Sequence, residues 1–137
     1  MKDEIFIVTI EKDKDGAFIA YNVDESPYTL IGRGATVKEA KADFENSMQE
    51  VKESEEERKG AAAPILGAAP VFRFDLSSLF EYYSMLNVSA FARYLGINET
   101  LMRQYKKGNT YISDAQLKKI EDGLHRLGAD FIGLRLV

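Results

Sequence analysis

The spacing of apolar residues changes near residue 36, from a strand pattern to a helix pattern. Before it, residues 5–10 form a β-branched run, and in residues 17–23 apolar side chains occupy alternate positions, as in strands. The sequence 13–16 (Asp-Lys-Asp-Gly) between them tolerates positive φ, so the two runs predict a β-hairpin. Residues 28–33 can form a third strand.

A helix is predicted to begin after Thr36. Thr36 and Glu39 fit a capping box, in which each side chain satisfies a free backbone N–H group of the first turn. Apolar residues then recur at helical spacing as far as Val51, which gives the helix one stripe to place on the sheet. The acidic run 53–57 is interpreted as a solvated helix end. The alternative is that it attracts a basic partner.

Residues 60–70 mark a change of composition, with small residues, two prolines and two glycines. This predicts a linker or irregular crossing, part of which can dock on the core, followed by a short strand at 71–74. Helices are expected at 75–86, 89–95, 98–107 and 114–127. Ser113 and Gln116 form a second capping box, and Gly128 is expected to end the last helix.

The expected fold class is therefore α+β. Residues 1–59 form a small antiparallel sheet with one packed helix, 60–74 a linker with a short strand, and 75–137 an all-helical domain that ends in a strand at 131–137. The runs 71–74 and 131–137 would each leave an unpaired strand edge. We expect them to pair with each other, with the N-terminal sheet, or across a dimer.

Residues 90–108 fit the requirements of a helix-turn-helix. The two helices need a small residue at their crossing, a turn residue that tolerates positive φ, an apolar plug, a cap, an inward face and a terminating glycine. Ala92 is the small residue, Gly96 the turn residue, Ile97 the plug and Asn98 the cap. Met102 and Tyr105 form the inward face, and Gly108 is the terminating glycine. A plain helical hairpin with a solvated polar face is the alternative.

The second helix of this motif, 98–107, is the expected recognition helix, because such helices present polar side chains to the major groove. Arg103 can pair with guanine, Gln104 with adenine, and Thr100 can contact a thymine methyl group. Phosphate contacts are expected from Lys106, Lys107 and Asn109. Two features are unfavourable: Leu101 would be exposed, and Glu99 would repel phosphate unless it accepts a hydrogen bond from cytosine.

Charge differs between the two parts of the chain. Residues 1–75 carry 10 Lys/Arg and 16 Asp/Glu, whereas residues 76–137 carry 8 and 6, which suggests two parts with different partners. The absence of cysteine excludes disulfides and thiolate metal sites. No run of about 20 apolar residues could span a membrane, and the charged N-terminus does not resemble a signal peptide, so a cytoplasmic location is expected.

Catalysis is not expected. The acidic residues 13, 15, 24 and 25 lie in turns or loops, and His125 has no second histidine as a metal-binding partner. Residues 32–34 (Gly-Arg-Gly) lack the strand-to-helix pattern of a phosphate-binding loop. We therefore expect no enzyme activity, no metal and no cofactor.

Residues 17–23 together with 32–40 resemble the N-terminal domain of HicB antitoxins, and the C-terminal half resembles the Cro/repressor-type helix-turn-helix that many of them carry. The resemblance implies a partial RNase H-like fold in the first part. It also implies that this part binds and occludes a HicA-like RNA-cleaving toxin, while the second part represses its own operon. The loop 24–28 departs from the family pattern, because it contains one proline where two are usual.

The expected function is therefore that of an antitoxin in a type II toxin–antitoxin pair, acting also as a transcriptional autorepressor. The expected partners are a HicA-like toxin, operator DNA, and further copies of the chain in a homodimer or tetramer. One alternative is a solitary HicB-like regulator, or small-molecule sensor, without a toxin. Another is an interaction module whose helix-turn-helix no longer binds DNA.

Overall fold

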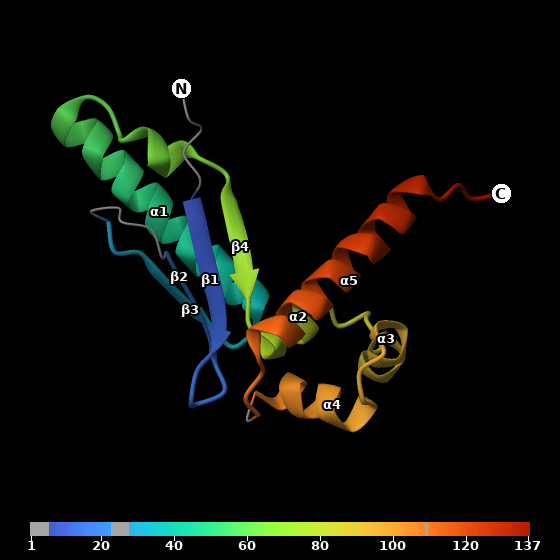
Figure 1. The fold of residues 1–137 in the computed structure, drawn as a ribbon. Coiled ribbons are helices and arrows are strands. Elements are labelled where there is room, and N and C mark those ends of the chain that lie inside the picture. The colour runs from blue at the N-terminus through green and yellow to red at the C-terminus, as the bar shows by residue number, and fades with distance from the viewer. Residues whose placement is uncertain (1–5, 23–27, 109) are drawn as a thin grey trace. The chain divides into compact units, whose positions relative to one another are not determined.

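The computed structural model describes residues 6–22, 28–108 and 110–137, and is shown as a ribbon in Figure 1. The fold is α+β, with a four-stranded mixed sheet and five α-helices within these residues. The chain divides into two compact units, Met1–Ser84 and Met85–Val137. Two sequence predictions lie outside the described residues: the loop 24–28, except for Tyr28, and the candidate phosphate contact Asn109.

The sheet of the first unit contains β1 (Phe6–Lys12), β2 (Phe18–Asn22), β3 (Ile31–Gly34) and β4 (Pro70–Phe74), in the order β3-β2-β1-β4. The first three strands form an antiparallel meander, with Thr9 opposite Tyr21 and Ala20 opposite Gly32. Strand β4 lies parallel to β1, with Val8 opposite Phe72. The meander agrees with the antiparallel sheet expected of residues 1–59. Pairing with this sheet was one of the three partners expected for residues 71–74, and the strand joins it in parallel because it returns after a helical crossover.

The turn between β1 and β2 is closed by Asp13. Its carboxylate accepts hydrogen bonds from the backbone N–H groups of Asp15 (2.9 Å) and Ala17 (3.1 Å). Gly16 adopts a φ of 86°, a conformation that a residue with a Cβ rarely takes. The local sequence therefore sets this hairpin.

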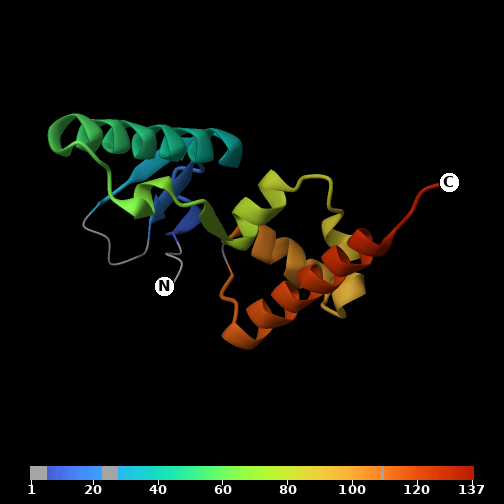
Figure 2. The ribbon, with the colours of Figure 1, turned by 90° about the horizontal axis from the view of Figure 1, so that it is seen from above.

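Helix α1 (Val37–Lys59) covers one face of the sheet, as Figure 2 shows. Its apolar stripe packs against alternate residues of β1 and β2 to form the core, whose buried members are Phe6, Val8, Ile10, Phe18, Ala20, Leu30, Val37, Ala40, Phe44, Met48 and Leu66. Strand β3 lies unusually close to α1. A Cβ added to Gly32 would be 2.3 Å from the backbone nitrogen of Phe44, so only glycine fits there.

The segment after α1 belongs to the first unit and is not an interdomain linker. A short 3₁₀ helix, η1 (Pro64–Gly67), places Leu66 in the core, and β4 then pairs with β1. The short strand predicted at 71–74 and the docking of part of the segment on the core are therefore confirmed, whereas the expectation of a linker between the two parts was wrong. Phe72 and Phe74 pack against the same core.

Helix α2 (Leu76–Tyr82) also belongs to the first unit, so the boundary between the units lies after Ser84 and not at residue 75. Glu81 accepts a hydrogen bond from the N–H group of Val37 (3.0 Å) at the start of α1. The ammonium group of Lys41 lies over the rings of Phe72 (4.1 Å) and Tyr82 (4.5 Å). These contacts join α2 to α1 and β4. The helix is shorter than the one predicted at 75–86.

The second unit contains α3 (Val88–Leu95), α4 (Glu99–Lys107) and α5 (Asp114–Gly133). The predicted strand at 131–137 was wrong: α5 continues through Gly133, and the residues after it form no strand. Gly128 lies inside this helix and does not end it. Apolar residues at helical spacing continue past Gly128, which favours continuation of the helix over a strand.

Candidate nucleic-acid interface

The turn between α3 and α4 is built from Gly96 and Ile97. Gly96 has a φ of 72° and donates its N–H to the carbonyl of Arg93 (3.1 Å), while Ile97 donates to the carbonyl of Ala92 (2.9 Å). This pair of bonds is the Schellman arrangement that ends a helix sharply. Ala92 and Ile97 are both buried, so the turn is fixed from inside as well as by its backbone.

Helix α4 is capped at both ends. The side chain of Asn98 accepts a hydrogen bond from the N–H of Leu101 (3.0 Å), which satisfies a donor that the helix leaves free. Gly108 adopts a φ of 82° and closes the other end. Met102 and Tyr105 are buried between these caps, so one face of α4 is directed inward.

Helix α5 packs against α3, the first helix of this motif. Ile120 and Gly123 are its buried residues, and a Cβ on Gly123 would lie only 2.0 Å from the Cδ2 atom of Leu95. The absence of a side chain at Gly123 therefore lets α5 approach α3 closely. Ser113 caps α5 through a hydrogen bond from the N–H of Gln116 (3.1 Å).

The outward face of α4 is polar and exposed. It carries Thr100, Arg103, Gln104, Lys106 and Lys107. Arg103 is held at the surface, because its guanidinium donates to the hydroxyl oxygens of Ser89 (2.9 Å) and Thr100 (3.1 Å). Two of the side chains expected to contact bases, Thr100 and Arg103, are thus brought together. Gln104, the third, is the next residue along α4 and is also exposed. Leu101 is half-buried, so its expected exposure is reduced.

Glu99 forms an ion pair with Arg93 of α3. The pair joins the two helices across the turn and offsets the negative charge that Glu99 brings to the N-terminus of α4. Sequence reasoning did not identify Arg93. The signal available was the opposite charge six residues upstream of Glu99, across a predicted turn.

The two units carry opposite net charge. Residues 85–137 contain 8 Lys/Arg and 5 Asp/Glu, a net charge of +3, whereas residues 1–84 contain 10 and 17, a net charge of −7. The unit that carries α4 is therefore the one with a net positive charge. Lysine and arginine on such a face supply the sequence-independent attraction to phosphate.

The acidic run 53–57 contains one buried residue, Glu55, which is 3% exposed. Its carboxylate accepts hydrogen bonds from the Tyr28 hydroxyl and from the N–H of Ala63 (3.0 Å), and Lys59 lies 3.9 Å away. The hydrogen bond from Tyr28, followed by that from Ala63, lowers the pKa of Glu55 below its ordinary value. The expectation that the whole run is solvated was therefore wrong at this position.

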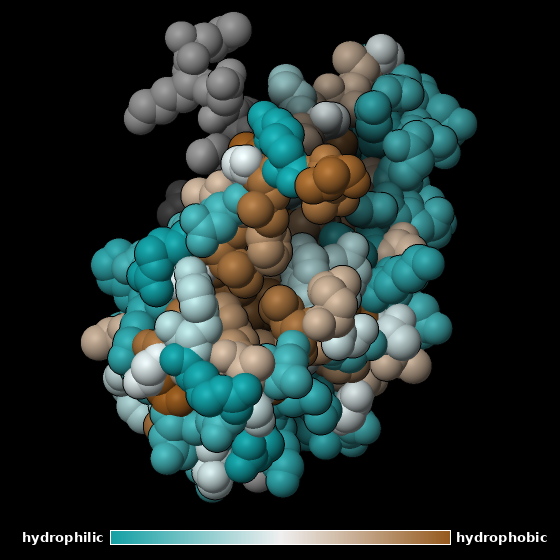
Figure 3. Space-filling model, turned by 90° about the vertical axis from the view of Figure 1, so that its right-hand side faces the viewer, coloured by the Kyte–Doolittle hydropathy of each residue, from teal (hydrophilic) through white to brown (hydrophobic). Residues whose placement is uncertain are grey.

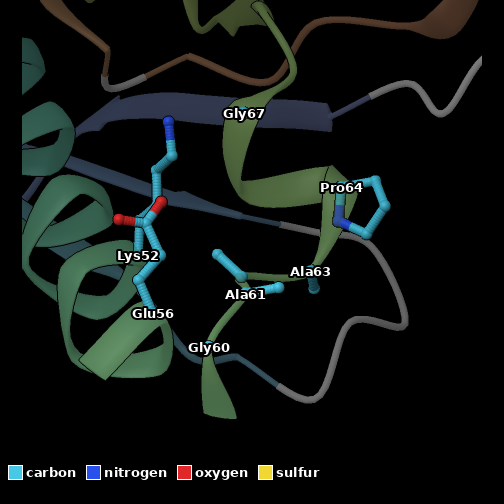
Figure 4. Close-up of a pocket in the computed structure, with 8 residues that line it drawn as sticks. Lys52, Glu56, Gly60, Ala61, Ala63, Pro64 and Gly67 are labelled. Atoms are coloured by element: carbon cyan, nitrogen blue, oxygen red, sulfur yellow. The ribbon is translucent and has the colours of Figure 1, made fainter. Parts of the chain in front are cut away.

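An open depression of about 430 Å³ lies beside this network, between the end of α1 and the segment that follows it. Figure 4 places Lys52 and Glu56 on the α1 side, and Ala61, Ala63 and Pro64 on the opposite side. Most of the lining consists of glycine, alanine and proline. Such a lining offers few polar groups to orient a ligand.

Over the residues that the structure describes, no group of three or more His, Cys, Asp or Glu side chains is arranged to hold a metal ion. Within the same residues, none of the helices combines the length and apolar character needed to cross a bilayer.

Comparisons with protein-family models, with curated proteins and with solved structures find no match to this chain.

Proposed function

We propose that this chain is an antitoxin and transcriptional autorepressor: its second unit binds operator DNA through α4, and its first unit neutralises a basic, HicA-like RNA-cleaving toxin. The observation that carries the DNA-binding part is the geometry of α3 and α4. Two short helices meet at a glycine turn, and the second presents a polar face that is not used in the core. In a helix-turn-helix, this second helix enters the major groove.

Side chains on the exposed face of α4 suit both kinds of DNA contact. Arg103 and Gln104 can each form two hydrogen bonds with the edge of one base, guanine and adenine respectively, and Thr100 can touch a thymine methyl group. Lys106 and Lys107 lie at the C-terminal end of α4, where they can contact phosphate. The hydroxyl partners of Arg103 hold its guanidinium on this face, and DNA binding exchanges those bonds for a base edge.

The ion pair of Glu99 with Arg93 changes the role proposed for Glu99. A carboxylate paired with a guanidinium repels phosphate less than an isolated one does, because the two charges largely cancel at a distance. Glu99 is therefore proposed to position α4 against α3 and not to accept a hydrogen bond from cytosine.

Two observations support the antitoxin part. The first unit has a net charge of −7, which favours association with a basic protein. Its antiparallel meander packed against one long helix is also compatible with the partial RNase H-like fold that the HicB resemblance implies.

DNA binding is tested by the fluorescence anisotropy of a labelled DNA fragment from upstream of the chain's own gene. Replacing Arg103 by alanine is expected to weaken specific binding by about 1–3 kcal/mol, roughly 5- to 150-fold. The matched control is Lys118→Ala, which removes one positive charge from the exposed surface of α5 and is expected to leave affinity within about twofold. An unchanged affinity of the Arg103 variant, or no binding by the wild type at low salt, contradicts the proposal.

Toxin binding is tested separately, by co-purification of the tagged chain with the product of the adjacent gene. Capture of a small basic protein that cleaves RNA, together with loss of its cleavage in the complex, supports the antitoxin. If DNA binding is retained and no such partner exists, the chain is a solitary regulator. The two experiments therefore fail independently.

A further inference from the structure

Thr100 and Arg103 lie about one turn apart on α4, and their side chains are in contact. The Arg103 guanidinium donates a hydrogen bond from Nη2 to the Thr100 hydroxyl (3.1 Å), and a second from Nη1 to the hydroxyl of Ser89 on α3 (2.9 Å). Because Thr100 precedes Arg103, the side chain of Arg103 leans toward the N-terminal end of α4, as long side chains in helices do. The guanidinium therefore lies beside Thr100.

This pair lies on a hydrophilic surface. Thr100, Arg103 and Gln104 are exposed, whereas Met102 and Tyr105 on the other side of α4 are buried. In Figure 3, hydrophilic residues, drawn in teal, dominate the lower part of the view, where Figure 1 places α4. The two contacting side chains are thus accessible to a ligand.

The contact limits how far apart the two bases recognised by this pair can be. A guanidinium donates two hydrogen bonds to the O6 and N7 atoms of guanine, and a threonine methyl group packs on the methyl group of thymine. Successive bases of one strand are about 3.4 Å apart, close to the 3.1 Å between the hydroxyl oxygen of Thr100 and Nη2 of Arg103. The two bases are therefore expected to be neighbours in the stack.

The positions of these groups in the major groove also favour bases on the same strand. The N7 atom of a purine and the C5 methyl group of thymine both lie toward the backbone of their own strand, and the groove is about 12 Å wide. A thymine on the opposite strand would place its methyl group across the groove from the guanine N7. Thr100 is too short to reach that methyl group while it lies beside Arg103.

We propose that Thr100 and Arg103 together recognise one dinucleotide in the operator, a thymine and a guanine at neighbouring positions of the same strand. This inference rests on the proposed function of α4 and adds part of the sequence that α4 binds. When Arg103 exchanges its hydroxyl partners for guanine, Thr100 stays beside it, because both residues are anchored on the same helix. The thymine methyl group then packs against the Thr100 methyl group.

The first test is selection of the full chain's preferred site from a pool of DNA duplexes with a randomised centre, followed by sequencing. The wild type is expected to enrich a thymine next to a guanine on one strand. Arg103→Ala should lose the preference for guanine and keep that for thymine. The matched control, Lys118→Ala, removes a positive charge from the exposed surface of α5 and should enrich the same dinucleotide as wild type.

The second test isolates the methyl contact, by fluorescence anisotropy on the selected duplex with deoxyuridine in place of the thymine. This change removes only the base methyl group, so the wild type should bind about fourfold more weakly, the value of one buried methyl group. Thr100→Ser lacks the partner methyl group and should not distinguish the two duplexes. Thr100→Val keeps a methyl group and should retain the fourfold difference. Circular dichroism should show wild-type helical content for both variants, because Thr100 is exposed.

The outcomes separate this inference from the proposed function. An enriched site without the dinucleotide overturns the inference alone, provided that Arg103→Ala weakens binding to that site. An equal effect of deoxyuridine on the wild type and on Thr100→Ser overturns it as well. Absence of any DNA binding by the wild type at low salt contradicts the proposed function, and the inference with it.

Discussion

The two units of this chain are stabilised by different kinds of contact. The first unit depends on approaches between segments far apart in sequence: β1 beside β4, the glycines of β3 against α1, and Glu55 against Tyr28 and Ala63. The second unit depends more on local features, namely a side-chain cap at the start of each helix and glycine turns after α3 and α4, beside the close approach of Gly123 to Leu95. Substitutions should therefore damage the first unit through packing and the second through backbone conformation.

The largest effect is expected from Gly32→Ala in the first unit. The new methyl group would lie 2.3 Å from the Phe44 nitrogen and 2.5 Å from the Ala40 oxygen, and backbone atoms of a helix cannot move aside locally. We expect a loss of about 3 kcal/mol in the free energy of unfolding, at the upper end of overpacking costs. Urea denaturation followed by circular dichroism measures it.

The matched control for this variant is Gly67→Ala, where a Cβ would meet no atom within 4 Å. Its midpoint should stay near that of wild type. Equal losses in the two alanine variants would show that close approach of β3 to α1 does not limit the stability of the first unit.

The next effect is expected in the second unit, from Gly96→Ala. Its φ of 72° lies in the left-handed region, which costs a residue with a Cβ about 1–2 kcal/mol. Hydrogen exchange of the α3 and α4 amides should accelerate, while exchange in the first unit stays unchanged. Gly96→Asn should cost less, because asparagine tolerates this conformation; a loss as large as that of alanine would argue against a backbone cause.

Replacing Glu55 by glutamine should change the pH dependence of stability. The pKa of Glu55 is lowered in the folded chain from its ordinary value of 4.5, so its contribution is present above pH 4.5 and is lost as pH falls through the lower folded value. Glu55→Gln should therefore be less stable than wild type at neutral pH, and the difference should shrink on acidification. Denaturation midpoints at several pH values, with the exposed Glu57→Gln as control, would measure this; a pH-independent difference would refute it.

The smallest effect is expected from the ion pair of Arg93 and Glu99. Both side chains are substantially exposed, so their coupling should be about 0.2–1 kcal/mol and should decrease with added salt. A double-mutant cycle with alanine at both positions isolates this coupling from the effect of Glu99 on the helix terminus. Coupling that persists in high salt would indicate a contact other than a surface ion pair.

Sequence reasoning succeeded where a structure is set by its neighbours in the chain. Asp13, Gly16, Thr36 and Asn98 act on backbone groups within four residues of themselves, so their roles follow from local patterns. A strand at 71–74 was predicted, but its pairing with β1 was only one of three possibilities, because the local sequence does not identify the partner strand. The same limit hid Glu55, whose burial depends on Tyr28, 27 residues away.

The length of α5 was missed for a different reason. Gly128 is a common helix terminator, and the residues 131–137 are rich in apolar side chains that suit either a strand or a helix. The helical spacing from Leu124 to Phe131 was the competing signal. For α4, the exposed face and its scaffold could be placed from the sequence, but the contacts of Arg93 and Arg103 could not, because they depend on how α3 and α4 cross.

The parallel pairing of β4 with β1 has a consequence for the order of events during synthesis. The meander of β1, β2 and β3 emerges early from the ribosome, but β1 remains an open edge until residue 74 has also emerged. Until then, the nascent chain exposes an apolar strand that can pair with neighbouring polypeptides. A ribosomal pause or a truncation before Pro70 should therefore favour aggregation far more than one placed after Ser84.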